Sequence, residues 1–158
     1  MRIFLTGATG FIGSKIIPEL LQAGHQVLGL TRSDAGAKTL TAAGAEAHRG
    51  DLEDPTTLRR GAEKADAVIH CAFDHDFSRF AENCELDRRA IETLGEVLVG
   101  SQRPLLVTSG LAVLKSGPVA TEEDPVVPPS PGYPRASESA ADALVARGVC
   151  AEIGRAHV

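Results

Sequence analysis

Short apolar runs alternate with segments of helical periodicity along most of the chain. Residues 2–6 form the first apolar run and end at a glycine, and residues 11–23 then place isoleucine and leucine on one helix face before Gly24. This succession predicts a strand, a turn and a helix, with a local bend where Pro18 removes a backbone donor. The same pattern predicts further strands over residues 26–31, 45–48, 67–71 and 104–108, and further helices over residues 35–43, 55–64, 80–99 and 135–147.

The predicted strands are apolar throughout and alternate with helices. Strands buried on both faces are typical of a parallel sheet that helices cover on both sides. The sequence therefore predicts a doubly wound α/β domain over residues 1–151. Residues 121–134 hold three acidic residues and five prolines, which predict an irregular surface loop before the last helix.

Length, composition and charge narrow the class of protein. The 158 residues fit one globular domain, and hydrophobic and charged fractions of 43% and 23% are typical of a soluble chain. The chain has 16 Lys and Arg residues but 21 Asp and Glu residues, so it has no excess of basic residues to neutralise a phosphate backbone. We therefore expect no nucleic acid as main ligand. No apolar run approaches the ~20 residues of a membrane span, and glycines interrupt the apolar N-terminus. We therefore expect no membrane partner, no signal peptide and a cytoplasmic protein.

The cysteines and histidines lack the spacing of a disulfide framework or a metal site. The three cysteines are odd in number and widely separated along the chain. None of the five histidines has a partner at the spacing of a metal-binding helix or a Cys-x-x-Cys pair. We expect ordinary thiols and no metal.

Three glycines lie between the first predicted strand and the first predicted helix. Gly7 permits a tight turn, Gly10 lets the backbone approach a pyrophosphate, and Gly13 lets the helix pack closely on the sheet. The N-terminus of the helix would then face the anion. Because strand and helix flank these glycines as the motif requires, the loop predicts a dinucleotide-binding site. We include in this site the neighbouring residues Thr9, Phe11 and Ile12.

The spacing Gly-x-x-Gly-x-x-Gly resembles the short-chain dehydrogenase/reductase superfamily, in its extended or atypical branch of NAD(P)-dependent epimerases and dehydratases. Residues 50–52 (Gly-Asp-Leu) are similar to a loop in which an Asp contacts the adenine, and residues 68–72 and 106–110 are similar to the ends of strands four and five. Residues 121–125 and 134–138 are similar to segments of atypical members. The resemblance covers residues 1–151 and implies a Rossmann-type fold, an NAD(P) cofactor and cofactor contacts from Asp51, Leu52, Cys71, Ala72 and Phe73. Without that context, Asp51 is equally well interpreted as the N-cap of the next helix.

The end of the second predicted strand carries the signal for cofactor preference. NAD-binding members place an acidic residue there to accept from the ribose 2′-hydroxyl, whereas this chain has Thr31, Arg32 and Ser33. A guanidinium attracts a 2′-phosphate, and the two hydroxyl groups can donate to it. We therefore predict NADP as the cofactor, with NAD less favoured. The alternative is that Arg32 is a solvated loop residue.

The resemblance also implies a catalytic Tyr, a Lys four residues later that lowers the pKa of that Tyr, and a hydroxyl group at the end of strand five. Tyr133 is the only tyrosine and stands near the expected position, but Ser137 occupies the place of the Lys, and no lysine follows Lys115. The candidate hydroxyl groups belong to Thr108 and Ser109.

Arg135 follows Tyr133 by two residues and would point to a different helix face, so we do not expect it to replace the lysine. Two interpretations remain open for Tyr133: a catalytic acid or base, and a packed loop aromatic. They correspond to two functions. One is an oxidoreductase or epimerase/dehydratase acting on a small-molecule substrate, and the other is a non-catalytic dinucleotide-sensing regulator resembling the NmrA-like proteins.

The end of the chain departs from the resemblance. Family members continue into a sixth strand and a substrate-binding part, whereas residues 152–158 fit neither a strand nor a cap and match one reading frame of a common sequencing adapter followed by a stop. We therefore expect a non-native tail on a C-terminally truncated domain, with strand five as an open edge. The resemblance further implies a homodimer through the helices of residues 80–99 and 135–147.

Overall fold

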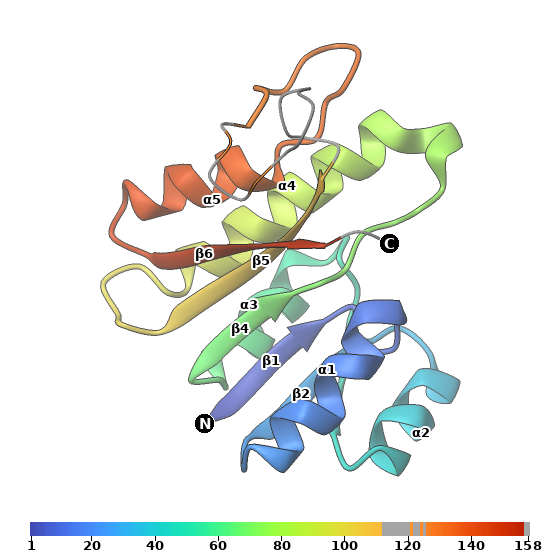
Figure 1. The fold of residues 1–158 in the computed structure, drawn as a ribbon. Helices are drawn as coiled ribbons and strands as arrows, with labels where there is room; N and C mark the ends of the chain where they lie inside the picture. Colours follow the sequence, from blue (N-terminus) through green and yellow to red (C-terminus); the bar gives the residue numbers. More distant parts are fainter. Residues whose placement is uncertain (112–120, 122–123, 125, 157–158) are drawn as a thin grey trace.

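The computed structural model describes residues 1–111, 121, 124 and 126–156. Six strands in this part of the chain form one sheet in the order β3-β2-β1-β4-β5-β6, and every neighbouring pair is parallel (Figure 1). This confirms the predicted doubly wound parallel sheet. The strands are β1 (Arg2–Thr6), β2 (Gln26–Thr31), β3 (Glu46–Arg49), β4 (Ala67–His70), β5 (Pro104–Gly110) and β6 (Cys150–Ala156).

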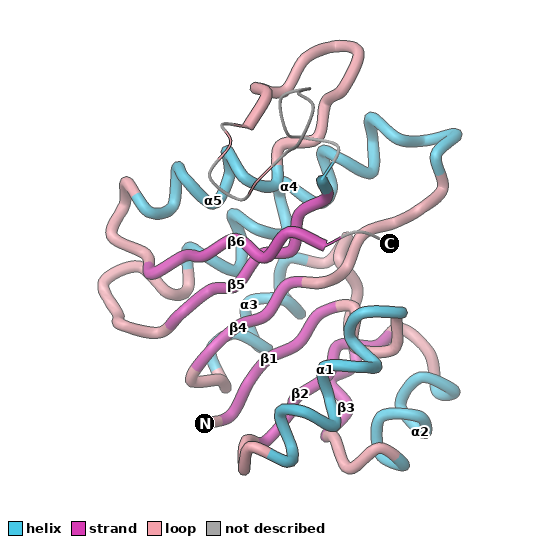
Figure 2. The backbone as a smooth tube through the Cα atoms, in the orientation of Figure 1, coloured by secondary structure: helices cyan, strands magenta, loops and turns pink. Residues whose placement is uncertain are grey.

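Helices cover both faces of the sheet (Figure 2). One face carries α1 (Phe11–Gln22) and α2 (Asp34–Ala42), and the other carries α3 (Pro55–Glu63), α4 (Phe80–Glu96) and α5 (Ser137–Val145), with a short 3-10 turn, η1 (Phe77–Arg79), before α4. None of the described helices is long and apolar enough to cross a membrane.

Alternation along the strands divides the apolar core into two clusters. Phe4 of β1 packs with Leu58 and Ile91 on the side of α3 and α4. The next residue, Leu5, points to the opposite face and packs with Ile17 and other side chains of α1 and α2. Side chains of successive strand residues point to opposite faces, so β1, β2, β4 and β5 each contribute to both clusters. This two-sided burial is why these four strands are rich in apolar residues.

The observed elements begin and end close to the predicted residues, and α1 continues through Pro18 without interruption. The described part of the predicted loop over residues 121–134 is irregular, with one isolated pairing between Ser130 and Tyr133. Residues 122–123 and 125 of that loop, and residues 157–158 of the predicted tail, lie outside the described residues.

The predicted open edge at β5 is wrong. Residues 150–156 form β6, which pairs with β5 from the partners Pro104 and Cys150 to the partners Gly110 and Ala156. Ile153 of β6 packs against the core cluster on the side of α4 and α5. The hydrogen bonds offered by the neighbouring edge outweigh the weak strand propensity of this segment. That residues 152–158 are a non-native tail stays a prediction.

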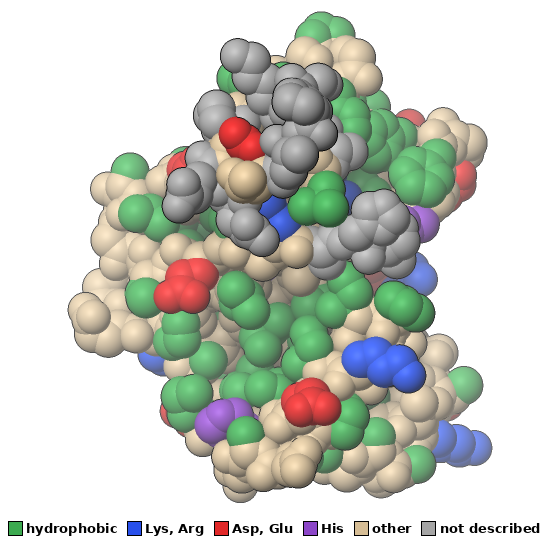
Figure 3. Space-filling model, in the orientation of Figure 1, with side chains coloured by type: hydrophobic (Ala, Val, Ile, Leu, Met, Phe, Trp, Pro, Cys, Tyr) green, Lys and Arg blue, Asp and Glu red, His purple; other side chains and the backbone are tan. Residues whose placement is uncertain are grey.

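One face of the sheet is incompletely covered. Helices α1 and α2 pack over the strands at one end of the sheet, whereas no described helix covers the same face over β5 and β6 (Figure 1). Apolar side chains gather in the middle of this face (Figure 3). Leu106 of β5 belongs to this face and is half-buried.

Candidate functional site

A cavity of about 620 Å³ opens at the carboxyl ends of strands β1 to β4. It lies where β1 leads into α1 on one face of the sheet and β4 leads towards α4 on the other. Loops that diverge in this way leave a crevice at the edge of a parallel sheet, which is where ligands of such sheets bind.

The cavity brings together most of the residues that the sequence predicts for the cofactor. Every one of them except Gly13 lines it: Gly7, Thr9, Gly10, Phe11, Ile12, Thr31, Arg32, Ser33, Asp51, Leu52, Cys71, Ala72 and Phe73. Their contact with a cofactor stays a prediction. Sequence reasoning missed the remaining described lining residues, which are Leu30, Glu53, Asp74, His75 and Leu86. Asp74 and His75 directly follow Phe73 and could have been found by extending that segment, whereas nothing in the sequence marks Leu86.

The glycine turn is packed against the backbone on two sides. Gly7 has φ +65°, and a Cβ there would lie 2.7 Å from the carbonyl oxygen of Cys71 and the amide nitrogen of Ala72. A Cβ on Gly13 would lie 2.2 Å from the carbonyl oxygen of Gly7. Gly13 therefore acts through close packing of α1 on the turn, in agreement with its predicted role, and does not line the cavity.

The N-terminus of α1 is free to take an anion. Gly10 is its N-cap residue, no side chain caps it, and its first turn carries no acidic residue. The first N–H groups of a helix have no partner within the helix and carry partial positive charge. Because these groups meet a cavity lined by glycines, the site fits the pyrophosphate of a dinucleotide.

The three residues at the end of β2 differ in how they meet the cavity. Arg32 has 75% of its side chain exposed, with Nε 3.9 Å from Asp51 Oδ2. The Ser33 hydroxyl accepts a hydrogen bond from the Gly36 amide at 3.0 Å, which leaves its own proton free to donate. The Thr31 hydroxyl is instead turned towards the Ser33 carbonyl, 3.5 Å away. Arg32 and Ser33 thus both keep hydrogen-bond donors beside the cavity.

The N-cap interpretation of Asp51 is wrong. Helix α3 is capped by Asp54, whose side chain accepts from the Thr56 amide. Asp51 Oδ1 accepts from the Glu53 amide at 3.2 Å and lines the cavity. Asp51 is therefore part of the cavity wall, and its contact with adenine stays a prediction.

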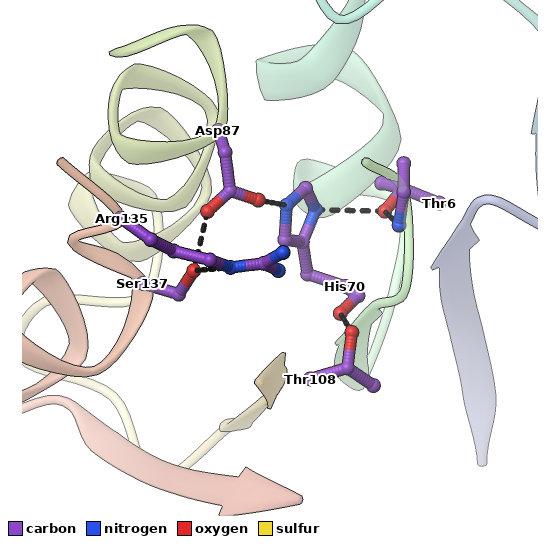
Figure 4. A network of polar contacts seen from close by, with 7 residues as sticks. Thr6, His70, Asp87, Thr108, Arg135 and Ser137 are labelled. Atoms are coloured by element: carbon purple, nitrogen blue, oxygen red, sulfur yellow. Dashed lines mark hydrogen bonds and ion pairs between the residues drawn. The ribbon is translucent and has the colours of Figure 1, made fainter. Parts of the chain in front are cut away.

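A buried chain of polar side chains links β1, β4, α4 and α5 (Figure 4). Asp87 Oδ2 accepts from the Ser137 hydroxyl at 2.6 Å, and its Oδ1 lies 3.2 Å from His70 Nε2. His70 Nδ1 lies 2.7 Å from the Thr6 hydroxyl. A carboxylate only accepts, so His70 donates from Nε2 and accepts from Thr6 at Nδ1. Thr6 directly precedes Gly7, so this chain ties the glycine turn to α5.

The candidate catalytic residues do not line the cavity, although Thr108 is bonded to Cys71, which does. Tyr133 lies in the loop before α5, and its ring packs 5.6 Å from that of Phe80. The Thr108 hydroxyl donates to the His70 carbonyl at 2.9 Å. Ser109 is buried, and its hydroxyl has no hydrogen-bond partner among the described residues. None of the three is among the described lining residues, and their catalytic role stays a prediction.

Arg135 does not occupy the helix position assumed from the sequence. Helix α5 begins at Ser137, so Arg135 lies in irregular chain before it. Its Nε donates to the Ser137 hydroxyl at 3.0 Å, and its guanidinium carbon lies 4.0 Å from the centroid of the Phe73 ring. The prediction that it lies on a different helix face is wrong, because helical geometry does not apply to a residue before the helix; that Arg135 does not replace the lysine stays a prediction.

We predict that Cys71 resists alkylation. Burial raises the pKa of its thiol to about 11, although a hydrogen bond with Thr108 partly lowers it. The thiolate is the nucleophile, and at about pH 8 a thiol of this pKa is about one part in a thousand thiolate. Iodoacetamide should therefore modify the exposed Cys150 and leave Cys71 unmodified, with Cys71 reacting only as the pH approaches 11. Peptide mass spectrometry checks this, and equal labelling of the two residues at pH 8 would contradict it.

A parallel sheet with a glycine turn at the crevice between β1 and β4 defines the Rossmann-type class of dinucleotide-binding domains. Within this class, the chain belongs to the NAD dependent epimerase/dehydratase family, whose family model matches residues 3–147. This confirms the resemblance to the epimerases and dehydratases of the short-chain dehydrogenase/reductase superfamily.

Three similar proteins illustrate this membership. An uncharacterized protein of Schizosaccharomyces pombe is 54% identical over 136 residues, covering 85% of this chain and 45% of the relative. An uncharacterized protein of Saccharomyces cerevisiae is 41% identical over 157 residues, covering 98% of this chain and 53% of the relative. The UDP-glucose 4-epimerase of Thermus thermophilus, solved as a complex with NAD, aligns with a TM-score of 0.78 at 25% identity. This alignment covers 98% of this chain and 54% of the epimerase chain. The chain thus spans about half the length of these relatives.

Proposed function

We propose that this chain is the cofactor-binding half of an NADP-dependent oxidoreductase or epimerase/dehydratase that acts on a small molecule. The observation that carries the proposal is the uncapped N-terminus of α1 at a glycine-lined cavity, with Arg32 at the rim of the same cavity. A bound nicotinamide would supply hydride transfer. The residues of this chain would hold the pyrophosphate at the glycine turn and the adenosine end beside Asp51 and Arg32.

The preference for NADP rests on charge at the end of β2. Arg32 is exposed and only loosely paired with Asp51, so its guanidinium can turn to a 2′-phosphate without losing a strong partner. The free proton of the Ser33 hydroxyl adds a second donor. No acidic side chain stands at these positions to accept from a ribose 2′-hydroxyl, as NAD would require.

We predict that Arg32→Ala lowers the affinity for NADPH and leaves the affinity for NADH almost unchanged. A hydrogen bond to a charged group contributes about 1.5–3 kcal/mol, so the ratio of the two dissociation constants should change roughly tenfold to a hundredfold. Fluorescence titration with each nucleotide measures this ratio. Arg60→Ala is the matched control, because Arg60 is exposed on α3 and distant in sequence from the lining residues. The proposed preference for NADP would be contradicted if the parent chain bound NADH more tightly than NADPH and Arg32→Ala did not change the ratio of the two dissociation constants.

A non-catalytic dinucleotide sensor is the second candidate. The observation that favours it concerns position 137, four residues after Tyr133, where the family has a lysine. In this chain Ser137 occupies that position, is buried and is hydrogen-bonded to Asp87. Tyr133 accordingly has no cationic side chain four residues later. Hydride exchange with a carbonyl or alcohol that Tyr133→Phe abolishes would select the enzyme. Partner binding that depends on the redox state of the nucleotide, without turnover, would select the sensor.

We extend the proposal to assembly and location. A homodimer through α4 and α5 would pair the helices of residues 80–99 and 135–147, which pack on each other along the same face of the sheet. Analytical ultracentrifugation distinguishes this dimer from a monomer. We propose a cytoplasmic location, consistent with an acidic chain of net charge −5.

A further inference from the structure

The guanidinium of Arg135 is held in a fixed plane beside the dinucleotide cavity. Its Nε donates to the Ser137 hydroxyl, which in turn donates to the buried carboxylate of Asp87. Its face lies 4.0 Å above the centre of the Phe73 ring, and Phe73 lines the cavity. One bond at its edge and one ring at its face therefore orient the group.

The outer edge of this guanidinium is available. Arginine has five N–H donors, of which Nε carries one. Neither Nη1 nor Nη2 of Arg135 makes a hydrogen bond, and the side chain forms no ion pair, with any residue that the structure describes. A planar guanidinium with two parallel free donors is suited to bind a carboxylate in a bidentate manner. A guanidinium that is already held in place loses less conformational freedom on binding.

Aromatic side chains gather around the same place. Ring centroids lie 6.2 Å apart between Phe73 and Phe80 and 5.6 Å apart between Phe80 and Tyr133. Phe77 and His75 complete the group, which we name the aromatic cluster: Phe73, His75, Phe77, Phe80 and Tyr133. Four of the six Phe and Tyr residues of the chain belong to it. Phe77 is nonetheless 67% exposed, so the cluster offers ring surface to a ligand.

The cluster lies at the end of the cavity opposite to Arg32. Phe73 and His75 follow β4, whereas Arg32 follows β2, and β1 with its glycine turn lies between these two strands. A dinucleotide whose adenosine end meets Arg32 and whose pyrophosphate meets the glycine turn directs its other end towards Phe73. A molecule held by Arg135 would therefore lie beside the reactive end of the cofactor.

We propose that Arg135 and the aromatic cluster bind a substrate in which a carboxylate is joined to a flat aromatic ring. The carboxylate accepts from Nη1 and Nη2 of Arg135, and the ring stacks on the cluster. This inference rests on the proposed function, since it names a substrate class for the place beside that cavity; Arg135 itself lines a smaller neighbouring pocket of about 170 Å³. It assigns Arg135 a contact with the substrate and none with the cofactor.

Benzoate is the probe for this site, with cyclohexanecarboxylate lacking the flat ring and benzamide lacking the charge. Calorimetric titrations of the chain, with and without NADPH, should give saturable binding of benzoate and weaker binding of the other two compounds. Arg135→Gln should raise the dissociation constant of benzoate about tenfold or more, since charged hydrogen bonds of about 1.5–3 kcal/mol are lost. Arg135→Lys keeps the positive charge but lacks the two parallel donors, so it should give an intermediate dissociation constant for benzoate. Arg147→Gln, at an exposed arginine beyond α5, is the matched control.

Two results would overturn the inference: equal benzoate affinity in the parent and Arg135→Gln proteins, or a loss of NADPH affinity in Arg135→Gln as large as the loss of benzoate affinity. Circular dichroism melts of each variant separate these results from misfolding, and Arg135→Lys provides the comparison if Arg135→Gln does not fold. Benzoate binding that depends on Arg135 in a chain that does not bind NADPH would support this site while contradicting the proposed function.

Discussion

Replacing Gly13 with alanine should abolish most of the affinity for NADPH and destabilise the chain. The added Cβ would lie 2.2 Å from the Gly7 carbonyl oxygen and 2.8 Å from the Ala8 Cα. Both atoms belong to the backbone, so α1 has to move away from the turn that it packs on. Overpacking of this kind costs about 1–3 kcal/mol of folding free energy. The displaced helix also carries the N–H groups that would face the pyrophosphate of the proposed cofactor, and a similar cost in binding would raise the dissociation constant up to roughly a hundredfold.

Gly132→Ala is the control for this substitution. A Cβ on Gly132 meets no atom within 4 Å, so the same chemical change should leave both stability and affinity unaltered. Urea unfolding and NADPH fluorescence titration measure the two quantities on the same samples. A Gly13→Ala protein that binds NADPH as tightly as the parent would show that close packing of α1 on the turn is not required.

Replacing Asp87 with alanine should produce the largest loss of stability. Asp87 has only 1% of its surface exposed, and it accepts from Ser137 and His70, which are equally buried. Removing one member of a buried polar network leaves the others without partners and costs about 3–5 kcal/mol. For a domain of this size, such a loss lowers the melting temperature by roughly 6–20 °C. Thermal unfolding followed by circular dichroism measures it.

Asp87→Asn separates the network from simple loss of volume. The amide keeps one acceptor for the Ser137 hydroxyl, so this variant should lose clearly less stability than Asp87→Ala. Asp142→Ala is the surface control, because Asp142 is exposed on α5 and its side chain forms no hydrogen bond among the described residues. It should change the free energy of unfolding by no more than about 0.5 kcal/mol. An Asp87→Ala protein as stable as Asp142→Ala would mean that the network contributes little.

Most of the fold follows from the period of the apolar residues. Strands β1, β2 and β4 are buried on both faces along most of their length, so their apolar runs can be recognised without knowing which strands they pair with. Strand β6 could not be found in this way, because Glu152, Gly154 and Arg155 interrupt its pattern. Its conformation comes from pairing with β5, and a pairing partner distant in sequence is invisible to a local pattern.

The residues of the candidate site likewise fall into two groups: those in contiguous segments, which the sequence predicts, and those that only the fold brings together. The glycine turn and the ends of β2 and β4 are contiguous segments, so their residues could be predicted as groups. The chain of Thr6, His70, Asp87 and Ser137 joins four elements, and no spacing marks its members. The sequence pattern assigned Arg135 to a helix face, whereas α5 begins only at Ser137 and the side chain lies over Phe73.

The distribution of the site along the chain has a consequence for biosynthesis. Every described residue that lines the cavity precedes Asp87, whereas Ser137, the hydrogen-bond donor to its carboxylate, belongs to the last helix. A ribosome releases the chain from its N-terminus, and segments fold as they emerge. The walls of the cofactor cavity are therefore synthesised before the group that completes the buried network.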